Sequence, residues 1–178
     1  YPVKPLIGCF ALSLLPVLFC LPVVAQDAGI GLGHHGANVF AEFSGGRTGQ
    51  GEGLVWGGSA GAYLQGSLLG FVVRGTALPS NSAIRVYDAV LGPRFAASLP
   101  FMRVFAEAGG GMGHTGAYDS NGNLTSDWGP AWQVNLGFAR RILPRVEWRI
   151  LEGSYSRIYT GRGVSPVMLS TGVTLHVW

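Results

Sequence analysis

The chain has 178 residues, a length that suits one domain. Charged residues make up 12% of the sequence and glycine contributes 29 residues, whereas soluble globular proteins usually have about 25% charged residues. This composition excludes a disordered acidic or basic tail protein. The net charge of +3 is spread out, without a Lys/Arg cluster among aromatic residues, so we do not expect nucleic acid as a partner.

Residues 1–25 have the pattern of a cleavable secretory signal peptide. Lys4 supplies a positive start, residues 6–24 form an apolar run, and small residues precede the polar stretch that follows. Cleavage is therefore expected after Ala25, which implies export. Residues 26–36 would then form a Gly-rich lead-in located in the periplasm.

Two other interpretations of the N-terminal segment stay open. About 20 apolar residues suffice for a retained transmembrane helix, although Pro16 and Pro22 interrupt this run. The stretch that ends at Cys9 looks like a lipoprotein lipidation box, although apolar residues follow it where a polar tether is usual. Cys9 and Cys20 are the two cysteines of the chain. After cleavage we therefore expect no disulfide, thiol nucleophile or cysteine metal site.

Downstream of residue 25, apolar residues alternate with small or polar ones. No run approaches 18 apolar residues, which excludes an α-helical membrane protein. A period of two is typical of strands, and it is clearest where Trp132, Val134, Leu136 and Phe138 share one face. We expect about eight strands, at residues 37–44, 53–65, 68–77, 84–97, 101–113, 131–139, 145–157 and 167–177.

The connections between these strands are expected to alternate in length. Tight turns are predicted near residues 65–67, 98–100 and 141–144, and longer polar loops near residues 44–52, 79–83, 114–129 and 159–165. Such alternation is typical of an antiparallel up-and-down transmembrane β-barrel with its tight turns in the periplasm. We therefore expect an all-β barrel over residues 37–178.

Alternation alone also fits a soluble β-sandwich, in which the apolar face points inward. The mid-strand charges favour the opposite orientation, because they lie mostly on the polar face and acidic and basic members nearly balance. Inside a narrow barrel such charges must pair, since an unpaired buried charge costs several kcal/mol. The charges expected to form this lumen network are Glu42, Arg74, Asp88, Arg94, Arg103, Glu107, Glu147, Arg149 and Glu152.

The polar face also carries many glycines, which leave room for bulky neighbours inside a small barrel. These are Gly57, Gly61, Gly70, Gly92, Gly109, Gly111, Gly137 and Gly172. The apolar face is expected to meet lipid, with Trp56, Trp132 and Trp148 near strand ends as an aromatic girdle. The lipid-facing positions that we single out are Trp56, Trp132, Val134, Leu136, Phe138, Leu169, Val173, Leu175 and Val177.

One strand breaks the alternation. Glu147 and Arg149 stand at odd positions, whereas Glu152, Ser154 and Ser156 stand at even positions. In a regular strand these two sets would point to opposite faces. A β-bulge near residues 150–151 would return both sets to the lumen.

Several segments also occur in a recognisable order. Leu91-Gly92-Pro93-Arg94 opens one strand, residues 101–111 form the next, residues 131–139 lead to a turn at Leu143-Pro144, and residues 149–155 precede a terminal strand at 169–178. This order resembles the small OmpA-like, opacity-protein-like outer-membrane barrels of Gram-negative bacteria. The resemblance implies an integral outer-membrane protein, exported through the periplasm, with a structural, adhesion or surface-interaction role.

The same resemblance implies two kinds of partner. Outer-membrane lipid and lipopolysaccharide would surround the barrel, and the barrel-insertion machinery would read the C-terminal strand. Family members end in an aromatic residue that follows alternating lipid-facing residues. Here the apolar set ends at Val177, and Trp178 falls one place out of phase.

The histidines give little support for catalysis. His34 and His35 lie in the lead-in, and His176 is expected near the periplasmic rim as a hydrogen-bonding group. His114 is followed by Thr115, so the His-x-Ser spacing of barrel lipid A deacylases is absent. A nucleophile needs a base and an orienting acid within reach, and the sequence does not bring such groups together. We therefore expect no catalytic residues.

Residues 119–123 and Asp127 resemble the start of a calcium loop. The sixth and twelfth positions hold Leu124 and Pro130 instead of Gly and Glu, which favours simple turn formation. No metal and no cofactor are expected. The alternatives to a structural or surface-interaction barrel are an outer-membrane lipid-modifying enzyme that uses His114, a narrow pore, and a secreted soluble β-sandwich.

Overall fold

The computed structural model describes residues 36–49, 54–79, 84–118, 124–161 and 163–177. The expected signal peptide, residues 26–35 of the expected lead-in and Trp178 lie outside the described residues. The described residues contain no helix that is long and apolar enough to cross a membrane.

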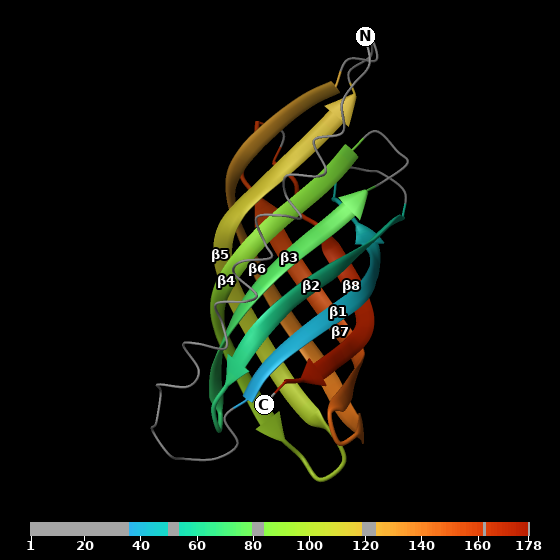
Figure 1. Ribbon diagram of the computed structural model, residues 1–178. Helices are drawn as coiled ribbons and strands as arrows, with labels where there is room; N and C mark the ends of the chain where they lie inside the picture. Colours follow the sequence, from blue (N-terminus) through green and yellow to red (C-terminus); the bar gives the residue numbers. More distant parts are fainter. Residues whose placement is uncertain (1–35, 50–53, 80–83, 119–123, 162, 178) are drawn as a thin grey trace. The chain divides into compact units, whose positions relative to one another are not determined.

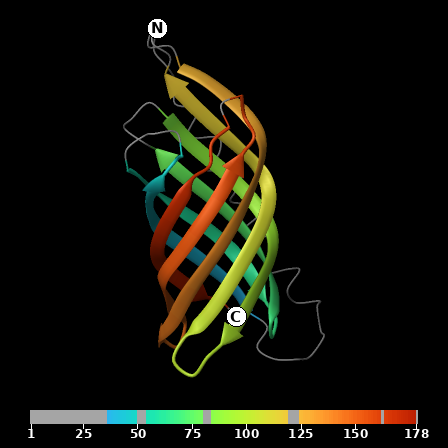
Figure 2. The same cartoon turned by 180° about the vertical axis from the view of Figure 1, so that it is seen from behind.

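Eight antiparallel strands close into one barrel (Figures 1 and 2). Each strand pairs with its sequence neighbours, and the first pairs with the last. This topology confirms the predicted all-β up-and-down barrel. The strands are β1 (Gly36–Arg47), β2 (Val55–Gln65), β3 (Leu69–Pro79), β4 (Ile84–Ser98), β5 (Arg103–Tyr118), β6 (Leu124–Leu143), β7 (Val146–Ile158) and β8 (Val167–His176).

The two ends of the barrel differ in their connections. We call one the short-turn end, where the links are residues 66–68, 99–102 and 144–145. The opposite end is the loop end, where the strands are joined through residues 48–54, 80–83, 119–123 and 159–166. An even number of strands brings the start of β1 and the end of β8 together at the short-turn end, where Asn38 is the register partner of His176.

The predicted loop at residues 114–129 is wrong. β5 continues to Tyr118 and β6 begins at Leu124, and the two strands stay in register from Met112↔Pro130 to Tyr118↔Leu124. The hairpin extends beyond the other strands at the loop end (Figure 1). Its ladder satisfies backbone groups that a loop would leave to water, while the turn-forming residues are confined to positions 119–123. For the same reason β1 reaches Arg47, inside the predicted loop at residues 44–52.

The β-bulge predicted in β7 is present. The register of β7 with β8 shifts between Arg149 and Glu152, and the register of β6 with β7 shifts after Phe138. One extra residue reverses the parity of the strand that carries it. Arg149 and Glu152 are consequently both buried inside the barrel, although three positions separate them.

The barrel interior at the loop end is apolar. The sequence predicted a polar interior along the whole barrel, so this apolar region is a difference from the expectation. A cluster of buried hydrophobic side chains occupies it, and we call this cluster the apolar plug. It consists of Val55, Leu78, Val86, Ala117, Ala131, Ile158, Val164 and Met168. Most plug residues lie near the loop-end termini of their strands, whereas Ala131 lies within β6 and Val164 lies between β7 and β8.

Lumen-facing glycines provide space for aromatic rings. A Cβ atom at Gly61 would lie 2.8 Å from Cζ of Phe40, and a Cβ atom at Gly137 would overlap the ring of Phe105. Both rings are buried. A Cβ atom at Gly61 would also overlap the backbone carbonyl oxygen of Val73. At both positions the ring of a neighbouring strand occupies the volume that a side chain would need.

We predict that Gly137→Ala destabilises the barrel by about 1–3 kcal/mol, because the added methyl group overfills a packed interior. Gly110→Ala is the matched control, since a Cβ atom at Gly110 meets nothing within 4 Å. The measurement is equilibrium urea unfolding of the refolded protein in lipid vesicles. Equal midpoints for the two variants would contradict this account of the interior.

Candidate functional site

The predicted lumen charges lie inside the barrel. Eight of the nine are buried, and Arg103 is the partly exposed member. The structure brings six of them into one cluster, which we call the ionic cluster. Its members are Glu42, Arg74, Arg94, Glu107, Arg149 and Glu152.

Arg74 of β3 contacts three carboxylates from three other strands. Its Nη1 atom lies 2.9 Å from Oε2 of Glu42 and 2.5 Å from Oε1 of Glu152. Its Nη2 atom lies 2.8 Å from Oε2 of Glu107. One guanidinium group therefore connects β1, β5 and β7 across the lumen.

Arg149 of β7 repeats this arrangement. Its Nε atom lies 2.5 Å from Oε1 of Glu42, and its Nη2 atom lies 2.5 Å from Oε2 of Glu152 and 3.2 Å from Oε1 of Glu107. Arg94 of β4 completes the cluster through Glu107. Three guanidinium groups face three carboxylates, so the ionised cluster is formally neutral, as a water-poor interior requires.

Aromatic rings separate the guanidinium groups. The Cζ atom of Arg94 lies 4.1 Å from the ring centroid of Tyr63 and 4.2 Å from that of Phe105. The Cζ atom of Arg149 lies 4.3 Å from the Phe105 centroid and 4.4 Å from the Phe40 centroid. Cation–π contacts of this kind stabilise desolvated guanidinium groups by about 2 kcal/mol or more.

Phe40 and Phe105 were not predicted as site residues, although their positions in the alternating strand pattern indicate that they face the lumen. Phe40 shares the parity of Glu42, and Phe105 shares that of Arg103 and Glu107. Parity along one strand was sufficient to place them inside, because alternate side chains of a strand point to the same face.

The remaining predicted lumen charges stand apart from the ionic cluster. Asp88 is buried beside its register partner Thr76, but it forms no ion pair with any described residue. Glu147 lies at the short-turn end, where its Oε2 atom is 3.0 Å from Nη1 of Arg103 and 3.2 Å from Nε2 of His176. His176 therefore lies at the short-turn end, close to Glu147.

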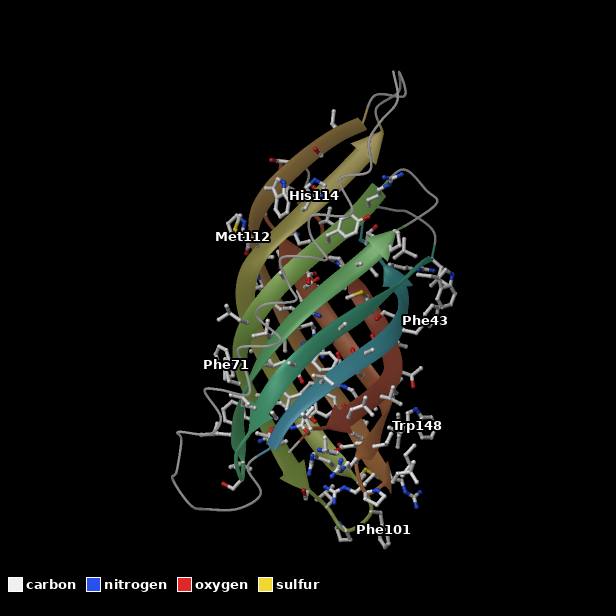
Figure 3. All side chains as sticks on the ribbon, viewed as in Figure 1. Phe43, Phe71, Phe101, Met112, His114 and Trp148 are labelled. Atoms are coloured by element: carbon white, nitrogen blue, oxygen red, sulfur yellow. The ribbon has the colours of Figure 1, made fainter. Side chains whose placement is uncertain are left out.

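The residues predicted to face lipid all lie exposed on the outside of the barrel. These are Trp56, Trp132, Val134, Leu136, Phe138, Leu169, Val173, Leu175 and Val177. Figure 3 shows Phe43, Phe71, Met112 and Trp148 projecting outward from the barrel in the same way. The outer surface is therefore apolar and the lumen is ionic, which is the reverse of a soluble β-sandwich.

The prediction that Trp132 lies near the end of its strand is wrong, because β6 begins at Leu124. It belongs instead to a group of outer aromatic side chains. Its ring centroid is 5.4 Å from that of Tyr155, and its Nε1–H donates to the hydroxyl of Tyr159 at 3.3 Å. Phe43 and Trp56 form a second outer pair, stacked with centroids 5.6 Å apart.

Among the described residues, His114 contacts aromatic rings. Its ring lies between two outer aromatic rings, 6.1 Å from Tyr87 and 4.8 Å from Trp128. Thr115 is buried, and its hydroxyl donates to Oγ1 of Thr160 at 2.9 Å. Neighbouring residues of a strand point to opposite faces, so His114 and Thr115 are separated. The candidate calcium loop at residues 119–123 lies outside the described residues.

The described residues contain no group of three or more His, Cys, Asp or Glu side chains arranged to hold a metal ion. The side chains of the ionic cluster fill the lumen and are paired with one another. Its carboxylates are already engaged by guanidinium groups, and the paired side chains are at most 1% exposed. Such an arrangement blocks a lumen that eight strands already make narrow.

The fold is shared with solved outer-membrane barrels. Neisserial surface protein A is similar, with a TM-score of 0.65 and 15% identity, and the similarity covers 79% of this chain and 96% of that protein. The N-terminal β-barrel domain of Pseudomonas aeruginosa OprF has a TM-score of 0.52 and 15% identity, covering 80% of this chain and 100% of that domain. The sequence matches no protein-family model and no curated protein. The chain therefore shares the closed antiparallel barrel fold of these two outer-membrane proteins.

We predict that Arg149→Met destabilises the barrel by about 3–5 kcal/mol, because it leaves three buried carboxylates with only the guanidinium groups of Arg74 and Arg94 and so gives the cluster an uncompensated negative charge. Arg103→Met is the control and should cost about 1 kcal/mol or less, since this ion pair is partly exposed at the rim. Urea unfolding in vesicles, followed by tryptophan fluorescence, measures both. A similar loss in the two variants would contradict the central role of the cluster.

Proposed function

We propose that the protein is an integral barrel of the bacterial outer membrane with a structural, adhesion or surface-interaction role. The observation that supports this most strongly is the inverted distribution of side chains. Exposed Leu136 and Leu169 belong to an apolar outer face, whereas Arg74, Arg149 and Glu152 are buried. A lipid environment stabilises the outer face, and a soluble monomer would rarely expose so large an apolar surface.

In this proposal the partners of the outer surface are acyl chains and lipopolysaccharide. Outer aromatic groups such as Trp132–Tyr155 and Phe43–Trp56 fit the aromatic girdles of membrane barrels. The barrel-insertion machinery would read β8, whose outward-facing series ends at Leu175 and is followed by the exposed Val177. The loop end would face the exterior, because tight turns of such barrels lie in the periplasm.

Heat-modifiability of the protein in outer-membrane fractions tests the proposal. A closed barrel is expected to keep its compact form in cold SDS and to change its mobility on boiling, and the protein should sediment with the outer membrane. Recovery in the soluble fraction without detergent would contradict the proposal and support a secreted soluble protein.

The narrow-pore alternative makes a different prediction. The ionic cluster and the apolar plug fill the lumen at two levels, so the reconstituted barrel should show no steady conductance in planar bilayers. A variant that removes the guanidinium groups, Arg74→Ala/Arg149→Ala, serves as the comparison if it inserts. Large, steady conductance of the unaltered protein would overturn the closed-lumen interpretation.

A further inference from the structure

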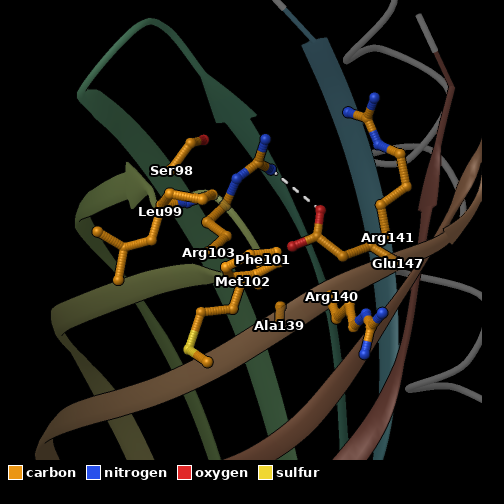
Figure 4. Close-up of a pocket in the computed structure, with 10 residues that line it drawn as sticks. Ser98, Leu99, Phe101, Met102, Arg103, Ala139, Arg140, Arg141 and Glu147 are labelled. Atoms are coloured by element: carbon orange, nitrogen blue, oxygen red, sulfur yellow. Dashed lines mark hydrogen bonds and ion pairs between the residues drawn. The ribbon is translucent and has the colours of Figure 1, made fainter.

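We infer that the short-turn end of the barrel carries a binding site for the headgroup of an anionic phospholipid. This inference rests on the proposed membrane location and adds a specific lipid class to it. The site is a groove of about 410 Å³ between the β4–β5 turn and the adjoining ends of β6 and β7 (Figure 4). The residues that carry the argument are Leu99, Phe101, Arg103, Arg140, Arg141 and Glu147.

The charges of this end are strongly unbalanced. Arg103, Arg140, Arg141 and Arg145 lie here, and among the described residues Glu147 is the carboxylate that accompanies them. Glu147 is buried and already engaged by Arg103 at 3.0 Å (Figure 4). Within the described part of the chain, Arg140, Arg141 and Arg145 form no ion pair. Three exposed guanidinium groups are therefore available to an external anion.

Exposed apolar side chains lie directly beside these arginines. Phe101 is 80% exposed and Leu99 is 52% exposed, and both line the groove with Arg140. Arg140 is also the register partner of Trp148, which projects outward (Figure 3). A small anion in water would need the arginines alone. A phospholipid needs both surfaces, because its phosphate and acyl chains lie within one molecule.

A second cavity extends the basic surface into the barrel mouth. It has a volume of about 670 Å³ and shares Arg103 and Arg141 with the groove, and Arg145 and His176 also line it. Arginine side chains therefore line both the groove and the cavity at the barrel mouth. Basic side chains are attracted to an anionic lipid surface, and salt screens this attraction. Charge complementarity therefore favours an anionic headgroup over a zwitterionic one.

The test compares spin-labelled phosphatidylglycerol with spin-labelled phosphatidylcholine around the full-length protein in phosphatidylcholine vesicles. Electron spin resonance measures the fraction of each lipid that the barrel immobilises. We expect phosphatidylglycerol to be preferred by roughly fivefold or more at low salt. The preference should fall in about 0.5 M salt, because the Debye length there is on the order of 4 Å and the attraction is screened. Arg140→Gln/Arg141→Gln/Arg145→Gln should bring the preference close to one.

The matched control is Arg47→Gln/Arg85→Gln/Arg157→Gln, which removes the same number of charges from the loop end and should keep the preference. Equal losses in the two triple variants, or no preference in the unaltered protein, would overturn the site. If the short-turn triple variant does not fold, Arg141→Gln alone must lower the preference. Failure of the proposed membrane location is distinguishable, because then neither labelled lipid would be immobilised.

Discussion

The lumen of an eight-stranded barrel holds side chains and little else, so a cluster of buried charges there is stable only when acidic and basic groups pair with each other. Arg74 and Arg149 meet this requirement by reaching carboxylates of β1, β5 and β7. Other features follow from the same constraint. The bulge in β7 turns both Arg149 and Glu152 inward, and Gly137 leaves room for a ring that contacts two guanidinium groups.

The barrel is asymmetric along its axis. The loop end is closed by the apolar plug, the middle by the ionic cluster, and the short-turn end opens into a mouth lined by Arg103, Arg141 and Arg145. The outer surface between the two ends is largely apolar, with aromatic groups that include Phe43–Trp56 and Trp132–Tyr155. In the proposed membrane setting, one end meets the exterior and the other meets the headgroups of the periplasmic leaflet.

Much of the fold could be predicted, because strand alternation is a local property of the chain. The parity break in β7 was sufficient to predict a bulge, and the glycines on the polar face indicated a crowded interior. The length of the hairpin formed by β5 and β6 could not be predicted, because the turn-forming residues near 119–123 also fit a longer loop. Pairing of the two strands decided this segment, because strand formation depends on cross-strand neighbours more than on the propensity of single residues.

The sequence by itself determined which side chains share a face. Phe138 and Leu136 belong to one surface and Gly137 to the other whatever the rest of the chain does, because successive residues of a strand point in opposite directions. Tertiary structure alone decided which charges meet. Barrel closure and register brought Glu42, Arg74 and Glu152 together and left Asp88 outside the cluster, because contacts across the lumen depend on how all eight strands are staggered.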